Sequence, residues 1–131
     1  MRVGVPREIK PDEYRVGLTP TAVREYVTHG HQVVVETGAG QGAGYADELY
    51  ARAGASILPD AAAVFEAAEL IVKVKEPQAV EWARLTDSHI LFTYLHLAPD
   101  PAQADGLLAS GCAAIAYETV TDDAGGLPLL A

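Results

Sequence analysis

Short apolar runs alternate with helix-type segments along almost the whole chain. The apolar runs have strand character and lengths, and they occur at residues 2–5, 32–36, 55–58, 70–75, 89–95 and 112–117. Most of the segments between them begin with residues that start helices, such as Thr19-Pro20, Asp60 and Asp100-Pro101. Asp47 is a further candidate cap, and Pro77 is expected to open a helix around residues 80–85.

This alternation predicts an α/β fold. The strands are continuous apolar runs instead of alternating ones, which is typical of a parallel sheet covered on both faces. We therefore expect a three-layer domain with a mainly parallel, flavodoxin-like sheet and helices on both faces. An antiparallel element is expected near the charged N-terminal loop. The length of 131 residues fits one domain.

Two neighbouring strands end in groups that can do chemistry. The run at residues 70–75 delivers Lys75, and the run at residues 89–95 delivers His96. Ligands of open α/β sheets bind at the carboxyl ends of the strands, so Lys75 and His96 would share one mouth. Lysine offers a point positive charge for a carboxylate or carbonyl oxygen, and histidine can exchange a proton near neutral pH. For each residue alone, a structural or solvated role is the more common alternative.

Other side chains are candidates at the same edge of the sheet. Tyr94 shares a strand face with His96 by the period of two, and Glu118 ends the last strand at the same mouth. Both could contact His96 and hold it in place without touching a ligand, although Glu118 could equally be an exposed residue. Arg15, in the charged loop before Leu18, is either a solvated arginine or a planar fork for a carboxylate. Lys73 lies deeper and is expected to be snorkelling or paired.

Composition restricts the partners and the compartment. The formal net charge is -9, which argues against nucleic acid and anionic membranes because both bind clustered cations. No window approaches the ~20 apolar residues of a membrane span, and the N-terminus shows no secretory signal. The single cysteine, Cys112, permits no internal disulfide and is expected to be a buried small hydrophobe. We therefore expect a soluble, cytoplasmic protein.

The glycine-rich stretch GAGQGAG imitates a cofactor motif. Gly38, Gly40 and Ala43 fit the G-x-G-x-x-A spacing, and Asp60 follows about twenty residues later. However, the helix that would follow is very short, and Asp60 precedes a helix where a ribose-binding acid should close a strand. We expect a tight turn here and no cofactor site. His29 and His31 have no partners for a metal site, so no metal is predicted.

Several segments resemble a known family. The opening MRVGVPREIKPDEYRVGLTP, the stretch from GHQVVVE to ARAGA, and the segments LIVKVKEP, ILFTYLHLA and AYETV are similar to the N-terminal part of alanine dehydrogenase. The related proton-translocating transhydrogenase α-chain shares the opening and the glycine loop. The resemblance covers essentially the whole chain. KVKEP and FTYLHLA are its specific parts, and the transhydrogenase relative lacks the histidine that stands here at His96.

The resemblance implies a reaction and roles for three residues. The reaction is the NAD-dependent oxidative deamination of L-alanine to pyruvate and ammonium, and its reverse. Arg15 matches the arginine that binds the substrate carboxylate, and Lys75 matches the lysine that contacts the carboxylate and carbonyl. His96 matches the general acid/base at the C2 heteroatom of the substrate. The partner implied is therefore a small molecule, L-alanine or pyruvate, in a homo-oligomeric enzyme.

The resemblance also implies that residues 1–131 are a segment of a substrate domain. Family members continue into a Rossmann NAD-binding domain that carries the true glycine fingerprint and a catalytic aspartate, and none of it is in this chain. We therefore expect no cofactor on this segment, no turnover by it alone, and an apolar flank that promotes self-association. The alternatives are a transhydrogenase α-chain segment and a non-catalytic flavodoxin-like ligand-binding domain.

Overall fold

The computed structural model describes residues 1–129 as a single sheet with helices on its two faces. The elements in chain order are β1 (Arg2–Val5), α1 (Pro20–Thr28), β2 (Gln32–Glu36), η1 (Gln41–Ala43), α2 (Asp47–Ala53), β3 (Ser56–Leu58), α3 (Ala61–Ala67), β4 (Leu70–Val72), α4 (Ala79–Trp82), β5 (Ile90–Thr93), α5 (Pro101–Ser110), β6 (Ala113–Ala116) and η2 (Tyr117–Thr119). Strand and helix alternate throughout, as the sequence predicts.

The sheet has six strands in the order β3-β2-β1-β4-β5-β6, and every pairing is parallel. The predicted α/β class with a parallel sheet is therefore confirmed. The order 3-2-1-4-5-6 is the classic order of doubly wound Rossmann sheets, and it has one more strand beyond β2 than the flavodoxin order 2-1-3-4-5. The antiparallel element expected near the N-terminal loop is absent from residues 1–129, because the loop after β1 pairs with no strand.

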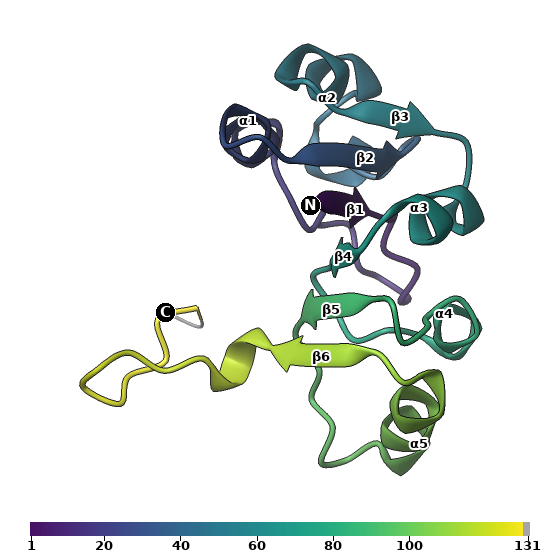
Figure 1. The fold of residues 1–131 in the computed structure, drawn as a ribbon, viewed down its shortest axis with the longest axis vertical. Helices are drawn as coiled ribbons and strands as arrows, with labels where there is room; N and C mark the ends of the chain where they lie inside the picture. The colour runs from purple at the N-terminus through teal and green to yellow at the C-terminus, as the bar shows by residue number, and fades with distance from the viewer. Residues whose placement is uncertain (130–131) are drawn as a thin grey trace.

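Helices cover both faces of the sheet, although not evenly. In Figure 1, α1 with α2 beside it covers one face, whereas α3, α4 and α5 line the other. On the α1 side, no helix within the described residues lies over β5 and β6. Residues 113–115 of β6 are exposed, and Ile115 keeps 47% of its surface in contact with solvent. This partly bare face corresponds to the apolar flank expected from the sequence.

The core has two clusters, one on each face of the sheet. The first joins β1 and β2 to α1 and α2 and includes the fully buried Val5, Val35 and Tyr50. The second joins β4 and β5 to α3 and α5 and includes Ile71 and Leu91. Full burial of one such aliphatic side chain contributes about 1.5–3 kcal/mol. The two clusters therefore fix the central strands whose ends carry the candidate site.

Local signals set most of the helix ends. The side chains of Thr19, Asp60 and Asp100 each accept a hydrogen bond from the amide three residues on, so all three predicted caps are confirmed. Gly54 and Gly111 follow their helices with positive φ angles of 108° and 74°, a conformation that glycine adopts without strain.

Two helix starts differ from the prediction. Ala46 is the N-cap of α2, and the carboxylate of Asp47 instead accepts hydrogen bonds from Thr37 Oγ1 and Gly38 N, at 2.6 and 2.9 Å. Pro77 does not open α4. Gln78 caps this short helix in a capping box with Glu81. Asp47 thus bonds to residues before its helix, whereas α4 begins two residues after Pro77 because the local capping box sets its start.

The buried face of α5 includes a polar residue. Leu107 of this helix is buried, whereas its neighbour Leu108 keeps 80% of its surface exposed. Gln103 is fully buried and donates from Nε2 to the carbonyl oxygen of Leu95 at 2.8 Å. A polar side chain therefore takes a core position because it satisfies a backbone carbonyl near the end of β5.

The two strands that carry the candidate site are shorter than predicted. β4 ends at Val72 and β5 ends at Thr93, so Lys75 and His96 lie in the irregular segments that follow. Cys112 is half-buried beside β6 and packs against the second core cluster. The predicted packing of Cys112 as a small hydrophobe is confirmed, although Cys112 is less buried than expected.

Candidate functional site

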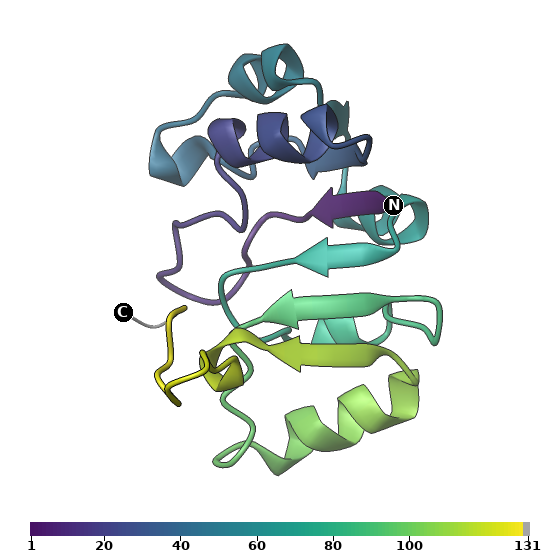
Figure 2. The same cartoon turned by 60° about the vertical axis from the view of Figure 1, so that its left-hand side comes forward.

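The site lies beyond the carboxyl ends of β1, β4 and β5. These strands point the same way in Figure 2, and the loop between β1 and α1 lies past their ends beside the segment that leaves β4. Gly17 permits this contact, because a Cβ built there would lie 2.5 Å from the carbonyl oxygen of Val72. β1 and β4 are also the point at which the strand order reverses, where doubly wound sheets bind ligands.

A buried charge cluster connects that loop to β4. The Nζ of Lys73 lies 3.1 Å from Glu8 Oε1 and 3.4 Å from Glu81 Oε2. These three side chains, which come from the loop, the end of β4 and α4, are only 1–2% exposed. Lys73 is thus a paired lysine, one of the two predicted alternatives. Burial raises the pKa of Glu81, while the neighbouring Lys73 charge opposes that rise.

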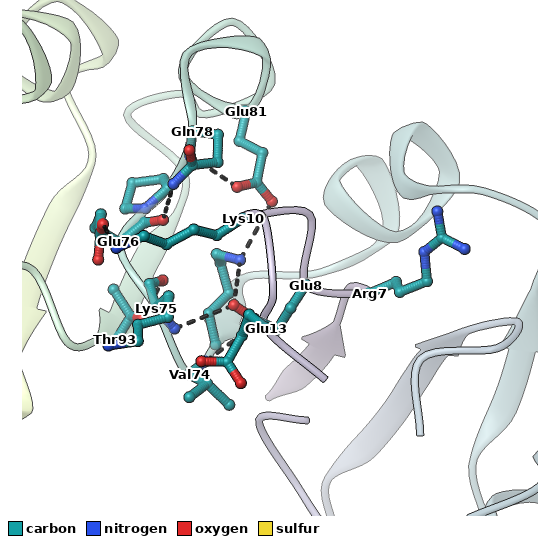
Figure 3. Close-up of polar contacts among 12 residues, drawn as sticks. Arg7, Glu8, Lys10, Glu13, Val74, Lys75, Glu76, Gln78, Glu81 and Thr93 are labelled. Carbon is teal, nitrogen blue, oxygen red and sulfur yellow. Dashed lines mark hydrogen bonds and ion pairs between the residues drawn. The ribbon is translucent and has the colours of Figure 1, made fainter. Parts of the chain in front are cut away.

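A second ion pair lies closer to solvent. Lys10 of the loop binds Glu76 of the segment after β4 (Figure 3). Burial alone would raise the pKa of Glu76, but the hydrogen bond from Lys10 and the Lys10 charge lower it below its usual value. Two ion pairs therefore fasten the loop to the segment between Lys73 and Glu76.

Lys75 is held between these attachments. Its backbone N–H donates to Glu8 Oε1 at 3.1 Å, and its carbonyl oxygen accepts from Thr93 Oγ1 at 2.7 Å. Its ammonium lies 5.2 Å from the centre of the Tyr94 ring, within the range of a cation–π interaction. Lys75 is therefore in contact with Tyr94, the residue predicted to support the site.

His96 lies on the same aromatic ring. Its imidazole stacks on Tyr94 with ring centres 5.5 Å apart, and its Nδ1 is 3.0 Å from the Tyr94 hydroxyl. The backbone of His96 has a positive φ of 48°, which is strained for a non-glycine residue. The carboxylate of Glu118 stabilises this turn by accepting from the N–H groups of Leu95 and His96, at 3.1 and 2.7 Å.

Arg15 is paired within its own loop. Its guanidinium makes a bidentate contact with Glu13, with Nη2 to Oε1 at 2.7 Å and Nε to Oε2 at 2.9 Å. The hydrogen bonds from Arg15 lower the pKa of Glu13 to about 2, and the charge of Lys75 contributes in the same direction. The Arg15 side chain remains 66% exposed, so a ligand can reach it.

Tyr117 contacts both the segment after β4 and the ring of Tyr94. Its hydroxyl donates to the carbonyl oxygen of Val74 at 2.5 Å, and its ring packs 6.1 Å from that of Tyr94. Burial raises the pKa of Tyr117, and the nearby positive charge of Arg15 opposes that rise. Arg15 therefore affects the pKa of both Glu13 and Tyr117.

Four of the five sequence-predicted residues are joined by contacts, because Lys75 and His96 both contact Tyr94 and Glu118 holds the backbone of His96. Arg15 is instead paired with Glu13 of its own loop, whose pKa the charge of Lys75 also lowers. A cleft of about 500 Å³ opens beside the loop and is lined by Arg15, but Lys75 and His96 lie outside its lining. The arrangement offers two cations for an anionic group and an imidazole for proton transfer.

Sequence reasoning missed Glu8, Glu13, Glu81 and Tyr117. One signal for the acidic residues was present: Lys73 interrupts an apolar run, and a buried lysine requires a carboxylate partner. The sequence does not tell which of 18 acidic residues supplies it. Glu8 lies 65 residues from Lys73 along the chain, and Glu81 lies in the short helix α4. Only the folded structure therefore identifies them as the partners of Lys73.

The remaining candidates make local contacts. His29 Nδ1 lies 2.7 Å from the carbonyl oxygen of Glu25, and His31 Nδ1 lies 3.2 Å from the N-terminal amine. Within residues 1–129 no three His, Cys, Asp or Glu side chains are grouped to hold a metal. Among the helices of the same residues, none has the length and apolarity that crossing a membrane requires.

Fold and site together define a doubly wound α/β domain with a cationic site at its strand ends. The family described as "Alanine dehydrogenase/PNT, N-terminal domain" matches residues 4–131, and the chain belongs to this family. The chain is 55% identical over 131 residues to an alanine dehydrogenase of Halomonas elongata, covering all of this chain and 35% of that protein. It thus spans about a third of the length of such relatives.

Solved structures agree with this assignment. An L-alanine dehydrogenase superimposes with a TM-score of 0.96 at 48% identity, covering 99% of this chain and 36% of that one. A transhydrogenase from Sinorhizobium meliloti superimposes with a TM-score of 0.84 at 28% identity, covering 90% and 35%. The resemblance read from the sequence is therefore confirmed.

Proposed function

We propose that residues 1–131 form the N-terminal part of the substrate domain of an NAD-dependent L-alanine dehydrogenase. The complete enzyme would convert L-alanine, NAD and water to pyruvate, ammonium and NADH. The observation that carries this proposal is the placement of Lys75 and His96 against one ring, that of Tyr94. A fixed cation and a proton-exchanging group side by side suit a substrate with an oxygen and a C2 heteroatom.

Each residue has a separate role in this proposal. Arg15 binds the substrate carboxylate with its planar fork, and Lys75 contacts the carboxylate and the carbonyl oxygen. His96 gives or takes the proton at the C2 heteroatom through Nε2, because Nδ1 faces the Tyr94 hydroxyl. Glu118 keeps His96 in place through its backbone. The substrate must also compete with Glu13 for Arg15, because the fork is engaged in the free protein.

The chain's own glycine loop does not fit NAD. The amide of Gly38 donates to the carboxylate of Asp47 at 2.9 Å, which sets a negative charge where a pyrophosphate would need a donor. A Cβ at Gly42 would lie 2.9 Å from the carbonyl oxygen of Tyr14, so this glycine serves close packing. We propose that NAD binds a separate domain of the complete enzyme, and that this segment alone shows no turnover.

Titration of pyruvate into the 131-residue chain tests the binding role. NMR signals of Lys75 and Tyr94 are expected to shift saturably in the wild type. An Arg15→Gln/Lys75→Gln double variant should lose the response, whereas an Arg24→Gln/Arg52→Gln control, which removes two cations on α1 and α2, should keep it. Equal responses in the wild type and the site variant would refute the proposed anion site.

A second function, a segment of a transhydrogenase α-chain, is favoured by the structural match to the S. meliloti protein. His96 separates the two. In the complete protein, His96→Ala should abolish alanine deamination if the first proposal holds. An unchanged deamination rate would refute the role of His96. We further propose that the complete enzyme is cytoplasmic and homo-oligomeric.

A further inference from the structure

Glu8 has an unusual set of partners for a loop residue. Its Oε1 accepts hydrogen bonds from Lys73 Nζ and from the backbone N–H of Lys75, and its Oε2 accepts from the backbone N–H of Val74, all at 3.1 Å. Figure 3 shows this carboxylate at the centre of the cluster, whereas Arg7 beside it points away. One buried side chain thus receives donors from three consecutive residues after β4.

The consequence for Lys75 is a backbone fixed on both sides. Glu8 holds its N–H, and Thr93, a fully buried residue of β5, holds its carbonyl oxygen. With both groups bonded, the direction in which the side chain leaves the backbone is set. That direction brings the ammonium over the ring of Tyr94.

Glu81 provides an internal comparison. It is as deeply buried as Glu8 and approaches the same Lys73 ammonium. Its other oxygen, however, accepts from the backbone N–H of Gln78 within its own helix cap. Glu81 makes no hydrogen bond to Val74 or Lys75. The two carboxylates therefore share burial, charge and ion-pair partner, and they differ in their contact with the backbone that carries Lys75.

The two carboxylates also differ in their surroundings. Burial raises the pKa of Glu81, and the neighbouring Lys73 charge opposes that rise. Glu8 accepts from three donors, which are Lys73 Nζ and the backbone N–H groups of Val74 and Lys75. Removing an acceptor oxygen at Glu8 would therefore leave a backbone donor unpaired in a buried place, which is costly.

We propose that Glu8 is a positioning residue for substrate binding. It aims the Lys75 ammonium by holding the backbone of Val74 and Lys75, and it ties the loop that carries Arg15 to the same strand end. The inference rests on the proposed function, in which Lys75 and Arg15 grip an α-keto acid. It adds a specific buried residue on which the geometry of both cations depends.

The first test needs no ligand. In the 131-residue chain, Glu8→Gln keeps the side-chain shape but presents an amide group to N–H donors that need an acceptor. We expect the amide signals of Val74 and Lys75 to move, and the ring-current shift that Tyr94 imposes on the Lys75 side chain to fall by about half or more. The matched variant Glu81→Gln should leave both sets of signals close to the wild type.

The second test uses pyruvate as the probe. Glu8→Gln should weaken pyruvate binding by about tenfold, and Glu81→Gln by less than about twofold. If Glu8→Gln does not fold, Glu8→Asp replaces it, because the shorter side chain keeps the charge near Lys73 but withdraws from the two amides. Circular dichroism establishes that each variant is folded.

Each outcome decides the inference. Equal losses of pyruvate affinity in the two variants would overturn it, because they would show that only the buried ion cluster matters. Unmoved Lys75 signals in Glu8→Gln would overturn it as well. If the wild type binds no pyruvate, the proposed binding role of this segment fails, while the Lys75 signals still decide whether Glu8 sets the position of that side chain.

Discussion

The adjacent ends of β4 and β5 hold their key residues in opposite ways. At the end of β4, Lys75 is fixed by Glu8 and Thr93, both of which are buried. At the end of β5, His96 is solvent-exposed and strained. Its turn depends on the half-buried Glu118. One strand end is thus built into the core, and the other projects from it.

The difference matches what each residue is proposed to do. A cation that orients a substrate works best when its direction is fixed before binding, because no free energy is then spent on ordering it. A proton-transferring imidazole must reach both the substrate and a proton acceptor, so exposure suits His96. The rigid end uses long-range contacts, and the exposed end relies on one carboxylate and a stacked ring.

The buried cluster is the place where the comparison predicts the largest effect. Lys73→Met leaves Glu8 and Glu81 buried without a cation, and removing one partner of a buried ion pair costs about 3–5 kcal/mol. We expect the free energy of unfolding, measured in urea, to fall by about this amount. The control Arg2→Met removes an exposed pair with Glu69 and should cost less than about 1 kcal/mol. Similar losses in both variants would show that the β4 end is no more rigid than the surface.

The end of β5 should respond less. Glu118→Gln weakens the acceptor for the N–H groups of Leu95 and His96, and hydrogen bonds to a charged group contribute about 1.5–3 kcal/mol. We expect a loss of that size in urea unfolding and faster hydrogen exchange at these two amides, with Lys75 unaffected. Slower exchange at His96, or exchange that rises equally at Lys75, would contradict the separation of the two ends.

The smallest expected effect is the contribution of Glu13 to the free energy of unfolding and its dependence on pH. The pKa of Glu13 falls from 4.5 to about 2 on folding, chiefly through the hydrogen bonds from Arg15. A lowered carboxyl pKa stabilises the fold above pH 4.5, and this contribution is lost as the pH falls through 2. Because Arg15 is largely exposed, Glu13→Gln should cost only about 1 kcal/mol at pH 7.

The difference between wild type and Glu13→Gln should stay constant from pH 8 to pH 5 and shrink below pH 4. Urea unfolding at a series of pH values measures it. A difference that grows on acidification would mean that Glu13 is not bound to Arg15 in solution.

Much of the fold could be predicted because its signals are local. Thr19, Asp60 and Asp100 cap helices through amides three residues away, and apolar runs reported the strands of the sheet. The strand ends were predicted too long, because Val74 and Leu95 continue the apolar pattern although the chain has already left the sheet there. The pattern of apolar residues does not show where the hydrogen bonds between neighbouring strands end.

The sequence predicted the basic residues of the candidate site but not its acidic residues. Lys75, His96 and Arg15 stand out because they follow strands or match a family segment. Glu8 and Glu13 looked like members of an ordinary charged loop. Their importance arises from contacts with residues distant in sequence or from a local pair, and neither is encoded in spacing. The burial of Gln103 likewise depends on a contact outside its helix, because Gln103 donates to the carbonyl oxygen of Leu95.

The left-handed backbone of His96 has a consequence for how such a protein changes under selection. Glycine tolerates this conformation freely, and replacing a strained residue by glycine there relieves about 1 kcal/mol. A library screened only for heat resistance should therefore enrich glycine at position 96 and lose the imidazole. Retention of histidine at this position in such a library would show that stacking on Tyr94 stabilises the fold by at least as much as the backbone strain destabilises it.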